Sequence, residues 1–369
     1  MGMYFVKNWY CKPLKDDAIY GAEWAGTSDP SWVRTDAAVG FADPNPYYAG
    51  MSTTPSSPFD NIMPWAGIRR VSNAEAGELV EYPKFYYKLS QPNGVGLKVQ
   101  ISMSQFDGSH VDPMHMDRGD GVGEREYAYI GRYHCHTSDY KSKTGGKPKA
   151  NITRSTARAA IHNLGSNIWQ MDFATRFTIW LLYIVEFADW NSQAKIGYGC
   201  GNDSSTENMG YTDGMTYHTG TTKSSRTTYG VGTQYRHIEG LWDNVYDWLD
   251  GCYYNGSGLN IIKNPSSFSD SSGGTAVGIP TSGCPSKFTA KDVAGTFPMF
   301  IPSEANGSNS TYSCDYWNFG SSYPCLLSGG SYDQYRNHGF FYLNYSSSSN
   351  SDANLGCRLM VLPPSRLSA

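Results

Sequence analysis

The chain has 369 residues, of which 14% are aromatic and 40 are glycine, and this composition favours a rigid, loop-rich globular protein over a helical bundle. Only 17% of the residues are charged and the formal net charge is −4, so the charge balance gives no reason to expect nucleic acid or an anionic membrane as a partner. The most apolar stretch, Phe177 to Ala188, is interrupted by Glu186 and is too short to cross a bilayer. We therefore expect no membrane insertion.

Targeting and cysteine signals are also weak. The N-terminus lacks the apolar core and the small-residue cleavage site of a signal peptide, so we expect a protein that is not exported by the usual route. The eight cysteines are scattered singly and form no C-x-x-C pair. This spacing predicts free, mostly buried thiols and argues against a zinc knuckle or a thioredoxin-type motif.

Turn-forming residues dominate the first part of the chain. Residues 1 to about 75 are rich in Gly, Pro and Ser and carry no helical period. We predict a small, irregular β-rich domain over residues 1–76, which would mediate attachment or oligomerisation. After it, apolar alternation predicts three strands, within 78–90, 96–104 and 126–136.

Two helices follow in the sequence. The first, within 152–165, opens with Thr and Ser as candidate N-caps and ends at Gly165 as a candidate C-cap. The second, within 169–191, has Asp172 as its candidate N-cap and an apolar stripe at three- and four-residue spacing. A long loop is predicted from Lys195 to Tyr229, followed by a helical core block from Tyr235 to Gly256.

Short strands are predicted in the remainder, around residues 297–302, 314–319, 323–327, 340–345 and 356–364. Two helices in the middle followed by many short strands indicate an α+β domain over residues 77–369.

Five segments carry a resemblance to a known family. They are EYPKFYYK (81–88), ITRSTAR (152–158), YRHIEGLWDNVYDWLDG (235–251), SGGSY (328–332) and LGCRL (355–359). The chain resembles phage tail-fibre tip proteins whose C-terminal part is a C-type lectin fold of the formylglycine-generating-enzyme type, a group that includes variable proteins diversified by retroelements. The resemblance spans roughly Glu78 to Leu362. It implies a C-type lectin-like fold with two helices and short, mostly antiparallel strands.

Each anchor of the resemblance also has a physical role. Trp242 and Trp248 can fill a broad core while their indole N–H groups donate to backbone carbonyls. Gly329 and Gly330 permit a turn that a Cβ would block. Arg358 is flanked by apolar residues, so we expect its guanidinium to be paired inside the core.

A polar and aromatic run lies near the C-terminus. From Tyr332 to Asn354, Tyr, Ser, Asn and Asp fill 15 of 23 positions. In the diversified relatives, Asn codons mutated at adenines produce this mixture, and it is also the composition of an antibody paratope. We predict a binding face within a variable region at about 312–359; its diversification is a hypothesis. The predicted ligand-binding residues are Trp317, Phe319, Tyr323, Tyr332, Asp333, Tyr335, Arg336, His338, Phe341 and Tyr345, of which Phe341 and Trp317 are the strongest candidates for core positions instead.

Catalysis and metal binding are not expected. The segment from Tyr332 to Tyr345 lacks the cysteine pair of formylglycine-generating enzymes, and the ligand motifs of calcium-dependent lectins are absent. Asp243, Asp247 and Asp250 are expected to cap turns or face solvent. His134-Cys135-His136 lacks a fourth ligand and is expected to be a partly buried strand, and Arg118-Gly119-Asp120 is expected to be a tight turn. We predict no catalytic residue, no metal and no cofactor.

The sequence thus predicts a non-enzymatic receptor-binding protein at the tip of a phage or prophage tail fibre. It would be made in the host cytoplasm and located in the virion. Its partners would be a host cell-surface receptor, protein or glycan, and other tail-fibre proteins, with a homotrimer expected by analogy. The alternatives are a bacterial surface adhesin of the same fold and, more remotely, an oxidase of the formylglycine-generating class.

Overall fold

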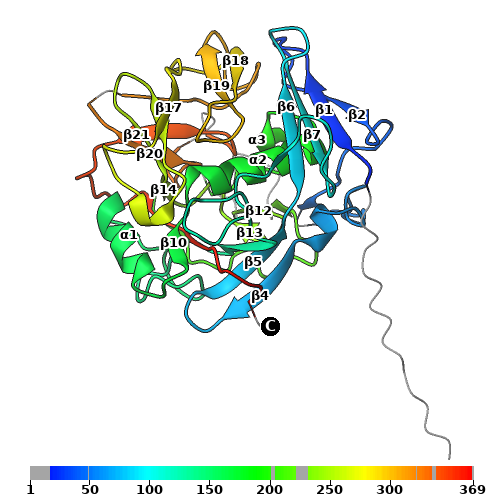
Figure 1. Ribbon diagram of the computed structural model, residues 1–369. Helices are drawn as coiled ribbons and strands as arrows, with labels where there is room; N and C mark the ends of the chain where they lie inside the picture. Colours follow the sequence, from blue (N-terminus) through cyan, green and yellow to red (C-terminus); the bar gives the residue numbers. More distant parts are fainter. Residues whose placement is uncertain are drawn as a thin grey trace, which may run out of the picture.

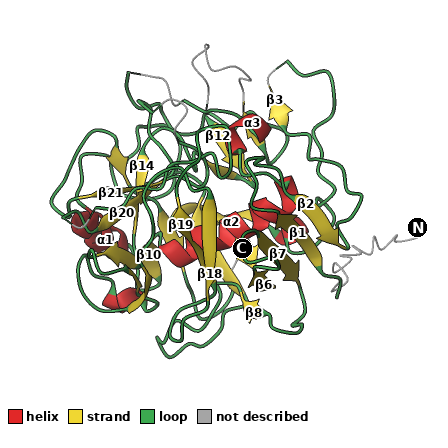
Figure 2. Ribbon diagram, turned by 90° about the horizontal axis from the view of Figure 1, so that it is seen from above, coloured by secondary structure: helices red, strands yellow, loops and turns green. Residues whose placement is uncertain are grey.

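The computed structural model describes residues 17–48, 50–200, 204–221, 232–320, 322–334 and 338–367. Over these residues the chain is mostly β-structure and loop, with few helices (Figure 2). The helices are α1 (Arg154–His162), α2 (Phe173–Phe187), α3 (Ser192–Lys195) and the 3-10 turns η1 (Trp65–Gly67) and η2 (Pro265–Ser267). None of the helices in this part of the chain is both long enough and apolar enough to span a membrane. The α+β class agrees with the sequence prediction.

Two five-stranded antiparallel sheets form the largest layers. The first has the order β2-β1-β7-β6-β8 and contains β1 (Tyr20–Trp24), β2 (Val33–Asp36), β6 (Tyr86–Ser90), β7 (Leu97–Ser102) and β8 (His110–Val111). The second has the order β10-β23-β9-β5-β4 and contains β4 (Arg69–Asn73), β5 (Gly77–Pro83), β9 (Tyr127–Gly131), β10 (Ile168–Gln170) and β23 (Leu359–Val361).

Smaller sheets surround these layers. One has the order β13-β12-β11-β3, with β3 (Tyr47–Tyr48), β11 (Gly220–Thr221), β12 (Thr233–Tyr235) and β13 (Ile238–Glu239). A second has the order β21-β20-β14-β22, with β14 (Tyr246–Leu249), β20 (Cys325–Ser328), β21 (Leu343–Ser346) and β22 (Leu355–Gly356). The others combine β15 (Cys252–Tyr254), β16 (Leu259–Ile261) and β17 (Thr275–Gly278), and pair β18 (Lys287–Lys291) with β19 (Met299–Glu304).

Helix α2 runs through the middle of the molecule (Figures 1 and 2). All its residues are buried, including the charged Arg176 and Glu186, so the rest of the protein covers this helix on every side. Its start is fixed by Asp172, whose side chain accepts a hydrogen bond from the Thr175 N–H at 2.8 Å, and it ends at Ala188 in the left-handed region with φ of 50°. The predicted helix and its N-cap are confirmed.

The other predicted elements are largely confirmed. Strands β7 and β9 lie within two of the predicted strand segments, and Leu97, Val99 and Ile101 of β7 alternate into the core. The segment 78–90, predicted as one strand, is divided into β5 and β6, which belong to different sheets. Helix α1 begins after the predicted cap Thr153, but its C-cap is Asn163 and not Gly165.

The prediction of a helical block from residue 235 to 256 is wrong, because this segment forms strands β13, β14 and β15. Gly240, Asn244 and Gly251 all have φ near +66°, a left-handed conformation that a right-handed helix cannot contain. The predicted strand around residues 314–319 is also absent. Trp317 makes only isolated bridges there, to Gly283 and Leu343.

The structural anchors of the resemblance behave as predicted. Trp242 donates its indole N–H to the Gly197 carbonyl at 3.0 Å, and Trp248 donates to the Ile152 carbonyl at 2.7 Å. Gly329 has φ of 77°, and a Cβ at this position would lie 2.5 Å from the Leu241 carbonyl oxygen. Both tryptophans are buried.

Arg358 is fully buried and connects several strands. Its Nε donates to Asp247 Oδ2 at 3.1 Å, and its terminal nitrogens donate to the carbonyls of Gly131, Arg132, Glu239 and Gly240 at 2.8–3.2 Å. One guanidinium therefore connects the segment between β22 and β23 to β9, β13 and β14. The predicted paired arginine is confirmed.

The domain boundary predicted at residue 76 lies between segments that pair and pack with each other. Residue 76 lies in the turn between the paired strands β4 and β5. In addition, β1 pairs with β7 along its whole length, and Trp24 and Trp65 belong to the same core cluster as α2. The described residues before 77 therefore share a sheet and a core with the rest of the chain. Local composition does not show the long-range pairing of β1 with β7, so it could not reveal this.

The described cysteines are free thiols, and all are buried except Cys284, which is half-buried. This agrees with the prediction from their spacing. Cys11 lies outside the described residues.

Candidate functional site

The predicted ligand-binding residues separate into core and surface positions. Trp317, His338 and Phe341 are fully buried, so their prediction as binding residues is wrong. Phe319 and Tyr332 are half-buried, while Tyr323 and Asp333 are exposed. Tyr345 is half-buried at the surface of β21. Tyr335 and Arg336 lie outside the described residues.

Trp317 and Phe341 pack against the central helix α2. The Trp317 ring lies 5.5 Å from the ring of Trp180 on α2, and Phe341 lies 5.5 Å from Trp180 and 4.8 Å from Trp190. Replacing a buried aromatic residue of this kind by alanine lowers the free energy of unfolding by about 3–5 kcal/mol. These two aromatics therefore support the surface from beneath and do not contact a ligand.

His338 is buried beside Gly330, whose missing side chain makes room for it. A Cβ on Gly330 would lie 2.3 Å from the imidazole Cγ. Burial lowers the pKa of His338 to about 3, and neither ring nitrogen has a hydrogen-bond partner among the described residues. The side chain is therefore a neutral core residue.

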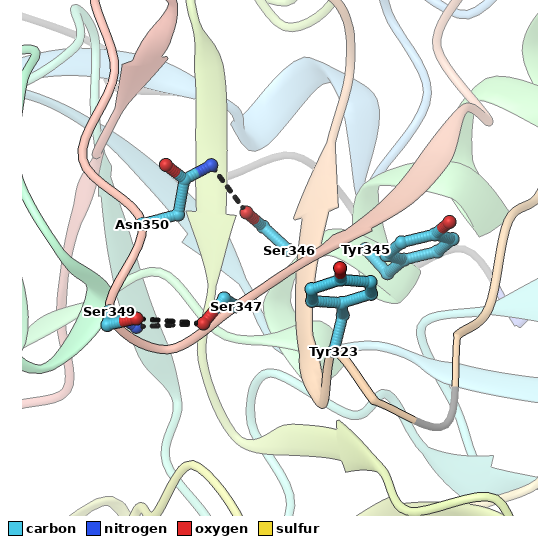
Figure 3. Close-up of a pocket in the computed structure, with 6 residues that line it drawn as sticks. All are labelled: Tyr323, Tyr345, Ser346, Ser347, Ser349 and Asn350. Carbon is cyan, nitrogen blue, oxygen red and sulfur yellow. Dashed lines mark hydrogen bonds between the residues drawn. The ribbon is translucent and has the colours of Figure 1, made fainter.

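Tyr323 and Tyr345 form the aromatic part of the surface. Tyr323 lies just before β20 and Tyr345 lies on β21, and the register of these two strands brings the rings side by side (Figure 3). Their centroids are 5.3 Å apart and their planes differ by 7°. Gly320 lies against the Tyr345 ring, since a Cβ there would be 3.1 Å from it. The side chain of Tyr323 remains 45% exposed.

A shallow hollow, here called the tyrosine hollow, opens next to this pair (Figure 3). Its volume is about 550 Å³. It is lined by Tyr323, Tyr345, Ser346, Ser347, Ser349 and Asn350.

Hydrogen bonds between the polar side chains shape the floor of the tyrosine hollow. The Asn350 amide donates to the Ser346 hydroxyl at 3.0 Å, and the Ser347 and Ser349 hydroxyls lie 2.9 Å apart (Figure 3). The Asn350 N–H donates to the Ser347 carbonyl at 3.0 Å, which closes a turn at the end of β21. None of the lining side chains is charged.

The serines and Asn350 of the tyrosine hollow were not among the predicted site residues. The run SSSSN directly after Tyr345 is the signal that could have identified them, because four hydroxyls and an amide follow the aromatic residue in a tight turn. The prediction named aromatic and charged side chains and overlooked the hydroxyl donors beside them.

Tyr332 and Asp333 occupy a separate stretch of surface. The Tyr332 N–H donates to the Asn244 carbonyl at 3.0 Å, which fixes the backbone. Partial burial, and then the neighbouring Asp333 and Asp352, raise the pKa of Tyr332. Asp333 accepts hydrogen bonds from Ser331 and from Asn354, the latter at 3.3 Å. These two residues are available at the surface but do not line the tyrosine hollow.

The aspartates considered for calcium were expected to cap turns or face solvent; they are buried, so the second alternative is wrong. Asp243 accepts from the Tyr211 hydroxyl at 2.7 Å, Asp250 pairs with Arg158 at 2.6 Å, and Asp247 contacts His134 at 3.0 Å. Each carboxylate already has protein partners in place of a cation.

Arg118 shows that the Arg-Gly-Asp tripeptide is not an accessible motif. Its side chain is buried and pairs with Asp172 at 2.6 Å. The arginine therefore stabilises the start of α2.

One further group of metal-ligating side chains occurs among the described residues. The ligand atoms of Asp60, Glu186 and His218 lie within 4.8 Å of one another. Arg236 donates to Asp60 at 3.1 Å and to both carboxylate oxygens of Glu186. Burial would raise the pKa of Asp60, but its contact with His218 and the charge of Arg236 lower it to about 2. The guanidinium supplies the positive charge here, so the group is an ion-pair network that fastens residue 60 to α2.

Comparison with known proteins leaves the family open. No protein-family model and no curated protein matches the chain. Among solved structures, the chain is similar to PvdO from Pseudomonas aeruginosa, with 10% identity and a TM-score of 0.35 over 79% of this chain and 97% of that protein. A likeness of this size assigns neither a fold family nor a function.

Proposed function

We propose that this protein is a receptor-binding protein of a phage or prophage tail fibre, built on a C-type lectin type scaffold. Its binding face would be the surface around β20 and β21. The observation that carries the proposal is the separation of the C-terminal segment into a buried frame and an exposed set of Tyr, Ser and Asn side chains. Phe340, Phe341 and Leu343 are buried, whereas Tyr323 and Ser349 are exposed.

The composition of the exposed set suits adhesion. Tyrosine provides large contact area at low entropic cost, and serine and asparagine provide adaptable hydrogen bonds. A rigid scaffold lowers the cost of ordering these groups on binding. Several copies on one fibre would add avidity to weak single sites.

The placement of the N-terminal strands supports attachment at the other end of the molecule. Strands β1 and β2 lie on the side opposite to β20 and β21 in both views (Figures 1 and 2). Strand β2 is an edge strand, and Val33 and the nearby Val39 are 72% and 67% exposed. An uncovered edge with exposed valines is suited to contact with a further chain of the fibre.

Adhesion to bacteria tests the proposal. The fluorescently labelled full chain is incubated with a panel of bacterial strains, beside a Tyr323→Ala variant and a Val33→Ser variant as matched control. We expect wild type and Val33→Ser to bind a subset of strains and Tyr323→Ala to lose most of that binding. Adhesion to no strain, or equal loss in both variants, would contradict the proposed binding face.

The surrounding DNA tests diversification, which is a separate part of the proposal. We expect a reverse-transcriptase gene and a near-copy of the codons for residues 312–359 that differs only at adenines. Tail genes as neighbours would favour a phage protein over a bacterial surface adhesin. Without the near-copy, the protein would be a fibre tip of fixed specificity.

A further inference from the structure

The tyrosine hollow combines an aromatic platform with neutral hydrogen-bonding groups. The Tyr345 ring contacts Gly320 and lies nearly parallel to the ring of Tyr323. Tyr323 is nevertheless 45% exposed, so part of its ring remains open to the tyrosine hollow and to solvent. The negative face of such a ring attracts the slightly positive C–H groups of a sugar ring.

We infer that the tyrosine hollow binds a neutral saccharide and does so without calcium. This inference rests on the proposed function and names the chemical class of its receptor. The exposed part of the Tyr323 ring would stack on one sugar ring. The hydroxyls of Ser346, Ser347 and Ser349 and the amide of Asn350 would exchange their present mutual hydrogen bonds for bonds to sugar hydroxyls.

Charge and size favour this ligand class. The lining contains neither arginine nor lysine, which an acidic sugar would need as a partner, and no carboxylate, which calcium would need as a ligand. The volume of about 550 Å³ lies within the range of small-ligand sites, about 300–1,000 Å³. A short neutral oligosaccharide fits these conditions.

The neighbouring strand edge argues against an extended peptide as the ligand. A peptide commonly adds a strand to an open sheet edge. On the free side of β21, however, the Leu343 N–H donates to the Tyr316 carbonyl at 3.2 Å, and the Asn318 N–H donates to the Leu343 carbonyl at 3.0 Å. The main-chain groups of Leu343 that would pair with a peptide are already used.

The decisive experiment measures binding of the full chain to an array of purified neutral and acidic oligosaccharides in the presence of EDTA. Three variants accompany it: Tyr323→Ala removes the platform, Tyr323→Phe keeps the ring, and Tyr316→Ala removes an exposed tyrosine outside the tyrosine hollow. We expect EDTA-resistant binding to neutral glycans that falls roughly tenfold in Tyr323→Ala. Tyr323→Phe should stay within about threefold of wild type, and Tyr316→Ala should match wild type.

Bacterial cells separate failure of this inference from failure of the proposed function. Adhesion that is lost after periodate treatment and survives proteinase supports a saccharide. Adhesion that survives periodate and is lost after proteinase, together with an empty array, overturns the saccharide and leaves the receptor-binding function standing. Binding only to acidic glycans, or binding that EDTA abolishes, also overturns the inference. Absence of both array binding and cell adhesion overturns inference and proposed function together.

Discussion

Replacing Arg358 by methionine tests the buried frame on which the proposed face depends. The substitution leaves Asp247 buried beside His134 without its main partner, and it removes the donors to four backbone carbonyls. Breaking a buried ion pair by removing one partner costs about 3–5 kcal/mol. At this protein size we expect a fall in melting temperature of roughly 4–6 °C.

The pH dependence of Arg358→Met identifies the cause of the loss. Burial would raise the pKa of Asp247, but the charge of Arg358, and then that of His134, lower it from 3.8 to about 2. The ionised Asp247 therefore stabilises the fold above pH 3.8 by about 2 kcal/mol, and this contribution is lost as the pH falls toward 2. In the variant, burial raises the pKa of Asp247, so the difference from wild type should be largest at pH 7 and smaller near pH 3.

The assay is thermal unfolding followed by tryptophan fluorescence at pH 7 and pH 3. Lys287→Met is the matched control, because Lys287 forms an exposed pair with Glu304 at 3.4 Å that contributes at most about 1 kcal/mol. The reasoning is refuted if both variants melt at the wild-type temperature, or if the loss in Arg358→Met is the same at both pH values. A pH-independent loss would mean that packing, and not the ion pair, is responsible.

Other substitutions separate frame from face in the same assay. Ser349→Tyr is expected to change the free energy of unfolding by less than about 0.5 kcal/mol, and Tyr323→Ser, which removes the stacked partner of Tyr345, is expected to cost about 0.5–1.5 kcal/mol. Trp317→Ser is expected to cost about 3–5 kcal/mol; equal losses in Trp317→Ser and Ser349→Tyr would contradict the division. Burial raises the pKa of Asp315 to about 8, so its contribution to stability is complete below pH 3.8 and is lost as the pH rises to 8. Asp315→Asn should therefore raise the melting temperature more at pH 8 than at pH 5. Burial lowers the pKa of His338 to about 3, so stability is expected to fall below pH 6.5 and to fall less in His338→Leu, as melting curves from pH 7 to 4 would show.

Local sequence signals predicted the regular elements well. Helix α2 and its cap Asp172 are encoded by neighbouring residues, as is the alternation of Leu97, Val99 and Ile101 in β7. The pairing of β1 with β7 joins residues more than 70 positions apart, and no local pattern reports it. The domain boundary predicted at residue 76 rested on local composition, which does not show this pairing.

Predicting the site from sequence failed where the backbone is irregular. The two-residue alternation of a strand tells inward from outward side chains only where a strand exists. Trp317 lies on isolated bridges, and His338 and Phe341 lie in loop and turn, so their direction is set by tertiary contacts with α2 and Gly330. Tyr345 lies on a regular strand, but its neighbour Tyr323 is fixed only by the register between β20 and β21.

The way β21 is held explains how such a face could accept many side chains. On one side β21 pairs with β20 through main-chain hydrogen bonds, and on the other side Leu343 is paired with the backbone of Tyr316 and Asn318. None of these bonds involves a side chain of the face. The frame residues Leu343 and Phe341 are anchored in the core, so these main-chain bonds do not depend on the side chain of Tyr345. Anchoring of a strand by its main chain is the physical condition for a face that changes its ligand without losing its scaffold.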